Sequence, residues 1–181
     1  MSKTAVVYWS GTGNTEAMAA KVVEGAQAAG AEVSLFTAAE FGADKMDEFD
    51  SVAFGCPSMG SEQLEEDEFE PMFLSCKAKL RGKKIALFGS CGWGDGEWMR
   101  TWEETCREDG AVLACDCVIC NDAPDAEAES ACEEMGKGAG IGEKKSRQGR
   151  PAKRRNTRCR MQADILTIFL NRCHRSRSTR F

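Results

Sequence analysis

The chain has 181 residues, enough to bury one hydrophobic core, so we expect a single folded domain. No segment reaches 18 consecutive apolar residues and the first residues lack a cleavable signal pattern, which argues against a membrane protein and favours a cytoplasmic one. The net charge of −5 is unevenly spread: residues 138–181 carry 13 Lys/Arg and 2 Asp/Glu, whereas residues 1–137 carry 11 basic and 27 acidic residues. We therefore treat the chain as an acidic body followed by a basic segment.

Apolar runs and helical patterns alternate along the acidic body. The short apolar runs predict strands, and the longer patterns with a 3.6-residue period predict helices. In chain order we expect strands at 4–9, 31–36, 51–55, 85–89 and 111–120, and helices at 14–29, 43–48, 71–80, 98–109 and 125–137. Five such repeats predict an α/β fold with three layers, in which helices cover both faces of a doubly wound five-stranded parallel sheet. Ligands of such folds bind beyond the carboxyl ends of the strands, where we expect loops 10–15, 56–70, 90–97 and 121–124.

The first of these loops is rich in glycine and in neutral hydrogen-bond donors. It leads directly into a predicted helix and consists of Ser10, Gly11, Thr12, Gly13, Asn14 and Thr15. Glycines let the backbone approach a ligand closely, and the helix N-terminus supplies unpaired N–H groups, so the loop predicts an anion site. It lacks the lysine of a nucleotide-hydrolysing loop, and Glu16 replaces the third glycine of a dinucleotide fingerprint. We expect one terminal monophosphate bound without a metal, and an ordinary helix N-cap is the alternative.

Two further loops carry side chains suited to a flat ring. Trp93 is flanked by Gly92 and Gly94, so it has little local structure to bury it and is available for stacking. Met59 can offer a polarizable thioether to the opposite face of the same ring. A phosphate holder with two ring-facing residues describes a site for flavin mononucleotide (FMN). The alternatives are that Trp93 anchors its own loop and that Met59 fills a gap in the core.

Over residues 1–140 the sequence resembles the short-chain flavodoxins. The matching motifs are YWSGTGNT at residues 8–15, MGSE at 59–62 and FGSCGWG at 88–94. The resemblance implies that FMN binds to Ser10, Gly11, Thr12, Gly13, Asn14, Thr15, Met59, Gly60, Ser61, Glu62, Ser90, Gly92, Trp93 and Gly94. By this resemblance residues 10–15 hold the phosphate, Met59 and Trp93 sandwich the isoalloxazine ring, Glu62 faces its N3 edge, and the Gly60–Ser61 peptide turns its carbonyl toward N5. Cys91 departs from the family, which usually has tyrosine at this position.

The resemblance implies a low-potential one-electron carrier that uses bound FMN and shuttles between redox partner proteins, not an enzyme. Acidic residues near the second and third loops are expected to disfavour an anionic reduced flavin and so to lower its potential; they are Glu62, Glu65, Glu66, Asp67, Glu68, Glu70 and Asp95. The same surface would attract basic partners to a monomeric protein, and a merely solvated charge run is the alternative interpretation. The alternative function is an FMN-dependent NAD(P)H:quinone or nitro reductase on the same fold.

The ten cysteines are scattered through predicted strands and helices, so we expect reduced, mostly buried thiols. Cys115, Cys117 and Cys120 raise a metal hypothesis, but the sequence has no second paired-cysteine motif to complete a zinc or iron–sulfur site. In an unbroken strand at 111–120, Cys115 and Cys117 would share one face and Cys120 would lie on the other. We therefore expect no metal.

Residues 141–181 have no counterpart in the flavodoxin motifs. They contain one short apolar run, at 165–170, and we expect most of the segment to be disordered. Three explanations stay open. The segment is an artefactual, out-of-frame extension, or a basic tail that binds nucleic acid, or an intramolecular clamp on the acidic body. We do not expect residues 1–140 to bind nucleic acid. The only histidine, His174, lies here, so residues 1–140 offer no histidine for acid–base catalysis.

Overall fold

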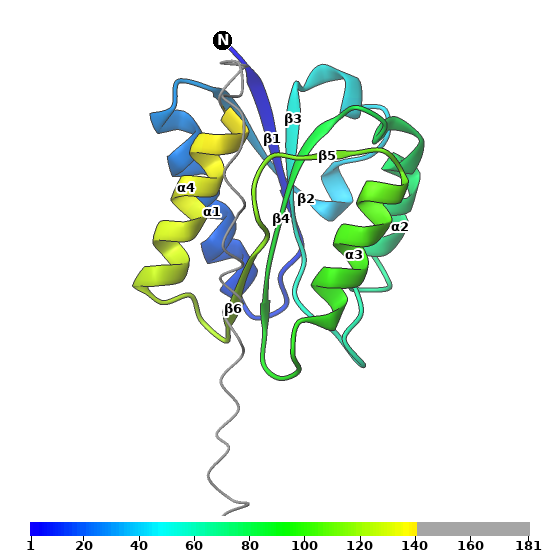
Figure 1. Cartoon of the computed structure of the whole chain (residues 1–181), viewed down its shortest axis with the longest axis vertical. Helices are drawn as coiled ribbons and strands as arrows, with labels where there is room; N and C mark the ends of the chain where they lie inside the picture. Colours follow the sequence, from blue (N-terminus) through cyan, green and yellow to red (C-terminus); the bar gives the residue numbers. More distant parts are fainter. Residues whose placement is uncertain (141–181) are drawn as a thin grey trace, which may run out of the picture.

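The structure is a computed structural model that describes residues 1–140; the predictions made for residues 141–181 lie outside the described residues. A central sheet lies between two helical layers (Figure 1). The elements in chain order, with η for a 3-10 helix, are β1 Lys3–Tyr8, α1 Asn14–Ala28, β2 Glu32–Thr37, η1 Ala38–Glu40, η2 Met46–Glu48, β3 Ser51–Gly55, α2 Phe69–Cys76, η3 Lys77–Lys79, β4 Lys84–Cys91, α3 Glu97–Glu108, β5 Val112–Leu113, β6 Val118–Asn121 and α4 Ala126–Gly140. None of these helices is both long and apolar enough to cross a membrane.

The sheet is parallel and its strand order is β2-β1-β3-β4-β5. β1 pairs with β2 on one side and with β3 on the other, so that Val6 lies between Leu35 and Ala53. The chain moves outward from β1 to β2 and then returns to β3 on the far side of β1. This reversal confirms the predicted doubly wound sheet, and it lies at β1 and β3, beyond whose carboxyl ends ligands of such folds bind.

The outermost strand is broken in two, contrary to the single strand predicted at 111–120. Ile85 of β4 pairs with Leu113, but Phe88 pairs with Val118, so the outer strand uses two more residues than β4 over the same stretch. The extra residues leave the hydrogen-bonded ladder as a bulge. Because two residues are added, the side chains from Val118 onward keep the faces that an unbroken alternation would give them, whereas Cys115, inside the bulge, is displaced to the other face.

The bulge separates the cysteines that the sequence pattern had placed on one face. Cys115 packs on the same side of the sheet as Cys120, whereas Cys117 packs in the opposite layer. The prediction that Cys115 and Cys117 share one face is therefore wrong, because the two-residue alternation of a strand does not continue through a bulge. Thiols on opposite faces of a sheet cannot share one metal ion.

Two helix predictions differ from the structure in their bounds. The helix expected at 71–80 begins earlier, at Phe69, and its α-helical part ends at Cys76, after which a 3-10 turn follows. Pro71 then lies in the first turn, where a missing N–H costs nothing. The helix expected at 43–48 is only the 3-10 turn η2.

Aromatic rings fill the layer between the sheet and helices α2 and α3. Phe54 of β3 meets Phe73 edge-on with ring centroids 5.3 Å apart. Phe69 and Phe73 both meet Trp102 of α3 edge-on, at 5.4 and 5.5 Å. Such contacts join α2 to α3 and hold the loops before these two helices in place.

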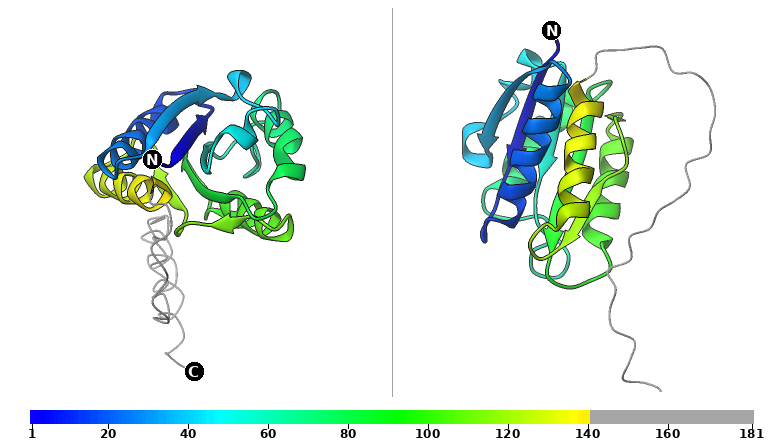
Figure 2. Two further views of the ribbon diagram at one scale, coloured as in Figure 1. Left: turned by 90° about the horizontal axis from the view of Figure 1, so that it is seen from above. Right: turned by 90° about the vertical axis from the view of Figure 1, so that its left-hand side faces the viewer.

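Helices α1 and α4 cover the other face and run side by side (Figure 2). Their contact is built on glycine: a Cβ at Gly25 would lie 2.0 Å from the carbonyl oxygen of Glu133, and a Cβ at Gly136 would lie 2.1 Å from that of Val22. The backbones of the two helices therefore touch directly, which fixes the position of α1 and of the loop before it.

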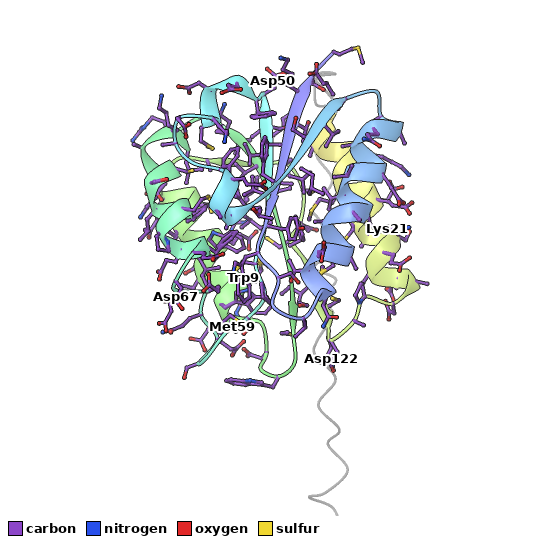
Figure 3. The ribbon with its side chains drawn as sticks, turned by 180° about the vertical axis from the view of Figure 1, so that it is seen from behind. Trp9, Lys21, Asp50, Met59, Asp67 and Asp122 are labelled. Carbon is purple, nitrogen blue, oxygen red and sulfur yellow. The ribbon has the colours of Figure 1, made fainter. Side chains whose placement is uncertain are left out.

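The loops after the strands gather at one end of the sheet. Figure 3 shows Trp9, Met59 and Asp122 at this end and Asp50 at the opposite end. Trp9 follows β1, Met59 follows β3 and Asp122 follows β6. The loops that the sequence singled out thus meet where the parallel strands end.

Candidate functional site

The loop between β1 and α1 forms an open helix N-terminus. Gly13 is the N-cap residue of α1, with φ of 89°, and it supplies no side chain to cap the helix. The hydroxyl of Ser10 accepts a hydrogen bond from the N–H of Gly13 at 3.0 Å. The N–H groups of Asn14, Thr15 and Glu16 lie in the first turn, where no preceding helical carbonyl can pair with them. Unpaired N–H groups at the positive end of a helix suit an anion.

The predicted anion-binding side chains divide into two groups. Thr12 is exposed and Ser10 and Asn14 are half-buried, so their side chains are accessible from the loop. Thr15 and Ser90 are buried, and their hydroxyls share a hydrogen bond with 3.2 Å between the oxygens. This bond connects the start of α1 to the end of β4, and it holds loop 10–15 next to loop 90–97.

The loop after β3 contains a small hairpin that exposes Met59. The N–H of Met59 donates to the carbonyl of Gln63 at 2.8 Å, and the reverse bond measures 2.9 Å. Gly60 and Glu62 in the turn have φ of 50° and 53°. Glycine at position 60 permits this conformation at no steric cost. Met59 is 39% exposed, so its thioether is free to meet a ligand.

Trp93 stands out from the loop after β4 and is 62% exposed. The next residue, Gly94, has φ of 98°, and a Cβ there would lie 2.6 Å from Oε1 of Glu62. Oε1 of Glu62 also accepts bonds of 2.9 Å from the N–H groups of Gly96 and Glu97 at the start of α3. The Glu62 carboxylate therefore connects loop 56–70 to loop 90–97 and keeps Met59 and Trp93 at the same end of the sheet.

Two residues that the sequence argument left out also belong to this end of the sheet. The Trp9 ring lies against Gly11, where a Cβ would come within 3.0 Å of the indole. Asp122 has φ of 56° and its N–H donates to the carbonyl of Cys91 at 2.8 Å. The sequence did indicate the position of Asp122, since the predicted loop 121–124 lies at the carboxyl end of a strand. Cys91 itself is buried, and its thiol donates to the carbonyl of Cys120 at 3.5 Å.

One of the seven residues predicted to form the acidic surface, Glu65, is buried and does not belong to that surface. Glu65 is buried, and its carboxylate accepts hydrogen bonds from the N–H groups of Asp67, Glu68 and Phe69 at 3.0, 2.9 and 2.8 Å. It therefore caps the N-terminus of α2. Burial raises the pKa of Glu65, but the three N–H groups lower it by more, so the pKa lies below its ordinary value.

The other predicted acidic residues stay at or near the surface. Glu66, Asp67, Glu68, Glu70 and Asp95 are exposed. The carboxylates of Glu62, Asp95 and Glu97 come within 4.8 Å of one another beside Trp93's loop. Arg100 pairs with Asp95 at 2.8 Å, so these three carboxylates and the guanidinium together leave a net negative charge next to the candidate site.

Replacing Glu65 by glutamine is expected to lower the free energy of unfolding at pH 7 by about 2 kcal/mol, because an amide cannot accept all three N–H bonds. The folded-state pKa is depressed, so the stabilising contribution is present above the unfolded pKa of about 4.3 and is lost as pH falls through the folded pKa. Urea titrations at pH 7 and pH 3 should therefore show a difference between the two proteins that shrinks at low pH. Glu66→Gln, at an exposed neighbour, is the control and should change little; an equal effect at both positions would contradict the capping role.

The geometry fits a small anionic ligand with a planar ring. The uncapped N-terminus of α1 and the accessible side chains of Ser10, Thr12 and Asn14 suit one phosphate. Met59 and Trp93 are apolar, exposed and on loops that Glu62 ties together. These are the features expected of an FMN site: a neutral phosphate cradle, and two side chains that lose exposed apolar surface when a ring binds.

Comparison with known proteins identifies a family over most of the described residues. The family model for flavodoxin matches residues 6–135. The flavodoxin of Megasphaera elsdenii is 44% identical over 134 residues, which cover 74% of this chain and 96% of that protein. The flavodoxin of Clostridium beijerinckii is 46% identical over 132 residues, which cover 73% and 95%. The solution structure of two-electron reduced Megasphaera elsdenii flavodoxin superposes with a TM-score of 0.71 and covers 76% of this chain and 98% of that one.

Proposed function

The chain belongs to the flavodoxin family, the FMN-containing low-potential electron carriers, and from this membership we propose that loops 10–15, 59–62 and 90–94 bind the FMN. FMN supplies the one-electron chemistry when it is bound, and the protein supplies binding, orientation and local charge. The chain is accordingly an electron carrier and not an enzyme. The observation that carries the site assignment is the uncapped N-terminus of α1 behind a loop of glycines and hydroxyls.

In this proposal the phosphate binds at residues 10–15. The side chains of Ser10, Thr12 and Asn14 and the N–H groups of the first turn of α1 hold its oxygens without a cation. Thr15 contributes its N–H group, while its hydroxyl bonds to Ser90 and keeps the loop next to β4. The phosphate sits at the positive end of a 15-residue helix, so its charge is stabilised by the dipole.

The ring of FMN would lie between Met59 and Trp93. Both side chains are exposed, and covering them removes apolar surface from water. Glu62 and the Gly60–Ser61 peptide lie in the turn that follows Met59. Gly60 has a positive φ, which glycine tolerates, so the Gly60–Ser61 peptide group can change its orientation without steric strain. Glycine at position 94 lets the Glu62 side chain approach loop 90–97 closely. Met59 and Trp93 would exclude water from the two faces of the ring, which would strengthen the effect of nearby charges on it.

We further propose that the acidic residues beside this site set the potential and select the partners. Glu62, Asp95 and Glu97 lie within 4.8 Å of one another, and like charge disfavours a reduced, anionic ring. The same charges attract basic redox proteins, and the association rate constant should fall as salt rises. A monomer acting in the cytoplasm fits this proposal, since the eight described cysteines are all free thiols.

We propose two parts for the chain: an FMN-binding domain at 1–140 and a basic extension at 141–181. The match to the two relatives spans 95–96% of their own length, so residues 1–140 correspond to a whole relative. The extension carries a net charge of +11.

The experiment that tests this function is FMN titration of the purified protein, followed by stepwise chemical reduction with absorbance spectra. We expect bound FMN with quenched fluorescence and reduction in two one-electron steps. Trp93→Ala should raise the Kd for FMN about tenfold and restore flavin fluorescence, because stacking contributes on the order of 1 kcal/mol. Trp93→Phe, which keeps a ring, is the control. A protein that fails to bind FMN would overturn the proposal, and unchanged quenching in Trp93→Ala would show that this residue does not stack.

A further inference from the structure

A groove of about 260 Å³ lies between loop 56–70, α2 and α3, next to the proposed FMN site. Its apolar wall contains Phe73 and Leu74 from α2 and Trp102 from α3. Leu74 is 53% exposed on the face of α2 that does not pack into the core, so its side chain is available to a partner at the groove. The indole N–H of Trp102 is buried and has no acceptor among the described residues. The groove therefore combines the exposed apolar side chain of Leu74 with a wall of buried aromatic rings.

The charged residues that line the groove are all acidic: Glu62, Glu66 and Glu70. Among the described residues, no lysine or arginine lines it, and the other polar lining residues are neutral. Glu66 and Glu70 are exposed and have no ion-pair partner among the described residues. A polypeptide that fits this groove must therefore have apolar side chains for Leu74 and Phe73 and basic side chains for the glutamates.

One segment of the chain has this pattern. Residues 165–170 form the single apolar run in the basic extension, with arginines at positions 158 and 160 before it and at 172, 175 and 177 after it. We propose that this groove binds the basic extension of the same chain, with the apolar run against Leu74 and the flanking arginines against Glu66 and Glu70. The proposal goes beyond the carrier function and does not depend on FMN.

The length of the extension allows this contact. Ala139, near the end of α4, accepts a hydrogen bond from Ser51 at the start of β3, so α4 ends at the opposite end of the sheet from the site. The stretch 141–164 can span up to about 80 Å, which exceeds the diameter of a 140-residue domain, on the order of 40 Å. Covalent attachment gives such a segment an effective concentration in the millimolar range, so even weak binding would occupy the groove.

The consequence is a covered acidic face. The groove and the proposed FMN site share Glu62, so a bound extension would place positive charge beside the edge where basic partners dock. In the full chain this would slow the association of such partners.

The test uses a labelled peptide of residues 155–177 in reducing buffer and fluorescence anisotropy. The peptide should bind the chain that ends at Gly140 and should bind the full chain at least tenfold more weakly, because there the groove is already filled. Leu74→Lys in the shorter chain should weaken binding at least tenfold. Leu35→Lys is the matched control: Leu35 is a leucine on β2, 47% exposed, and the substitution changes the net charge equally. It should leave the affinity within twofold, and urea titration confirms that both variants fold.

Several outcomes would overturn the proposal. The first is that the peptide does not bind at concentrations up to about 1 mM, the effective concentration that the attached segment can reach. The second is that the peptide binds the full and the shortened chains with equal affinity. The third is that Leu74→Lys and Leu35→Lys weaken binding equally. A scrambled peptide that binds equally well would show attraction by charge alone. Dimers of the full chain that disappear on shortening it would assign the groove to a second copy's extension instead.

Discussion

Replacing Thr12 by aspartate is expected to weaken FMN binding by about two orders of magnitude. The side chain of Thr12 is exposed in the loop before α1, where the proposed phosphate binds without a cation. Aspartate removes a neutral donor and adds a negative charge next to the phosphate. At an effective dielectric constant of about 20, two unit charges about 5 Å apart repel by about 3 kcal/mol, which corresponds to a factor of about 100 in Kd. Isothermal titration of the apoprotein with FMN measures the change.

Thr12→Asn is the control for this substitution, because asparagine has the size of aspartate and keeps a donor without the charge. We expect it to change Kd by less than about tenfold, the equivalent of one neutral hydrogen bond. The loss in Thr12→Asp should also shrink as salt rises, since the repulsion acts near the surface. Equal affinities for the aspartate and asparagine variants would show that the phosphate binds elsewhere.

The second large effect concerns the contact between α1 and α4. Gly136→Ala is expected to destabilise the fold by at least about 3 kcal/mol and to lower the melting temperature by about 10 °C. A Cβ at this position would lie 2.1 Å from the carbonyl oxygen of Val22 and 2.8 Å from the backbone nitrogen of Ala26. Both atoms belong to the backbone of α1, so no side-chain rotation relieves the clash, and the helices must move apart. Thermal unfolding followed by circular dichroism measures the loss.

Gly138, two residues further along α4, is the matched control. A Cβ there has no neighbour within 4 Å, so Gly138→Ala adds helix propensity without a clash. We expect it to leave stability unchanged or to raise it by up to about 1 kcal/mol. Equal and small effects at both positions would mean that α4 does not pack against α1 through Gly136.

Most of the fold was predictable because each element has a local signal. Apolar runs located β1 to β4 within one or two residues, and the glycine-rich loops located the starts of α1 and α3. The parallel direction of the strands also followed from the alternation of strands and helices, since parallel strands need crossover helices. Family membership confirms the function that the loop motifs implied.

The errors arose where a position depends on distant pairing. The sequence of residues 111–120 does not itself predict a bulge, because the interruption of the outer strand depends on how β4 pairs with Leu113 and then with Val118. Glu65 was expected at the surface because it stands in an acidic run. Its burial follows from the start of α2 at Phe69, whose N–H needs an acceptor. An earlier start for α2 was readable from Pro71, which favours the first turn of a helix.

For the candidate site, the residue types and their order along the chain predicted the chemistry: neutral donors without lysine for a phosphate, and two exposed apolar side chains for a ring. Their arrangement depends on contacts between residues far apart in sequence. The Thr15–Ser90 hydrogen bond joins the first loop to β4, and the bonds from Gly96 and Glu97 to Glu62 join the second loop to α3. Local sequence encodes turns, caps and periodicity because these involve neighbours within a few residues. Which loops meet, which acid is buried and where a groove remains open are decided only when the layers pack, because those energies come from contacts across the fold.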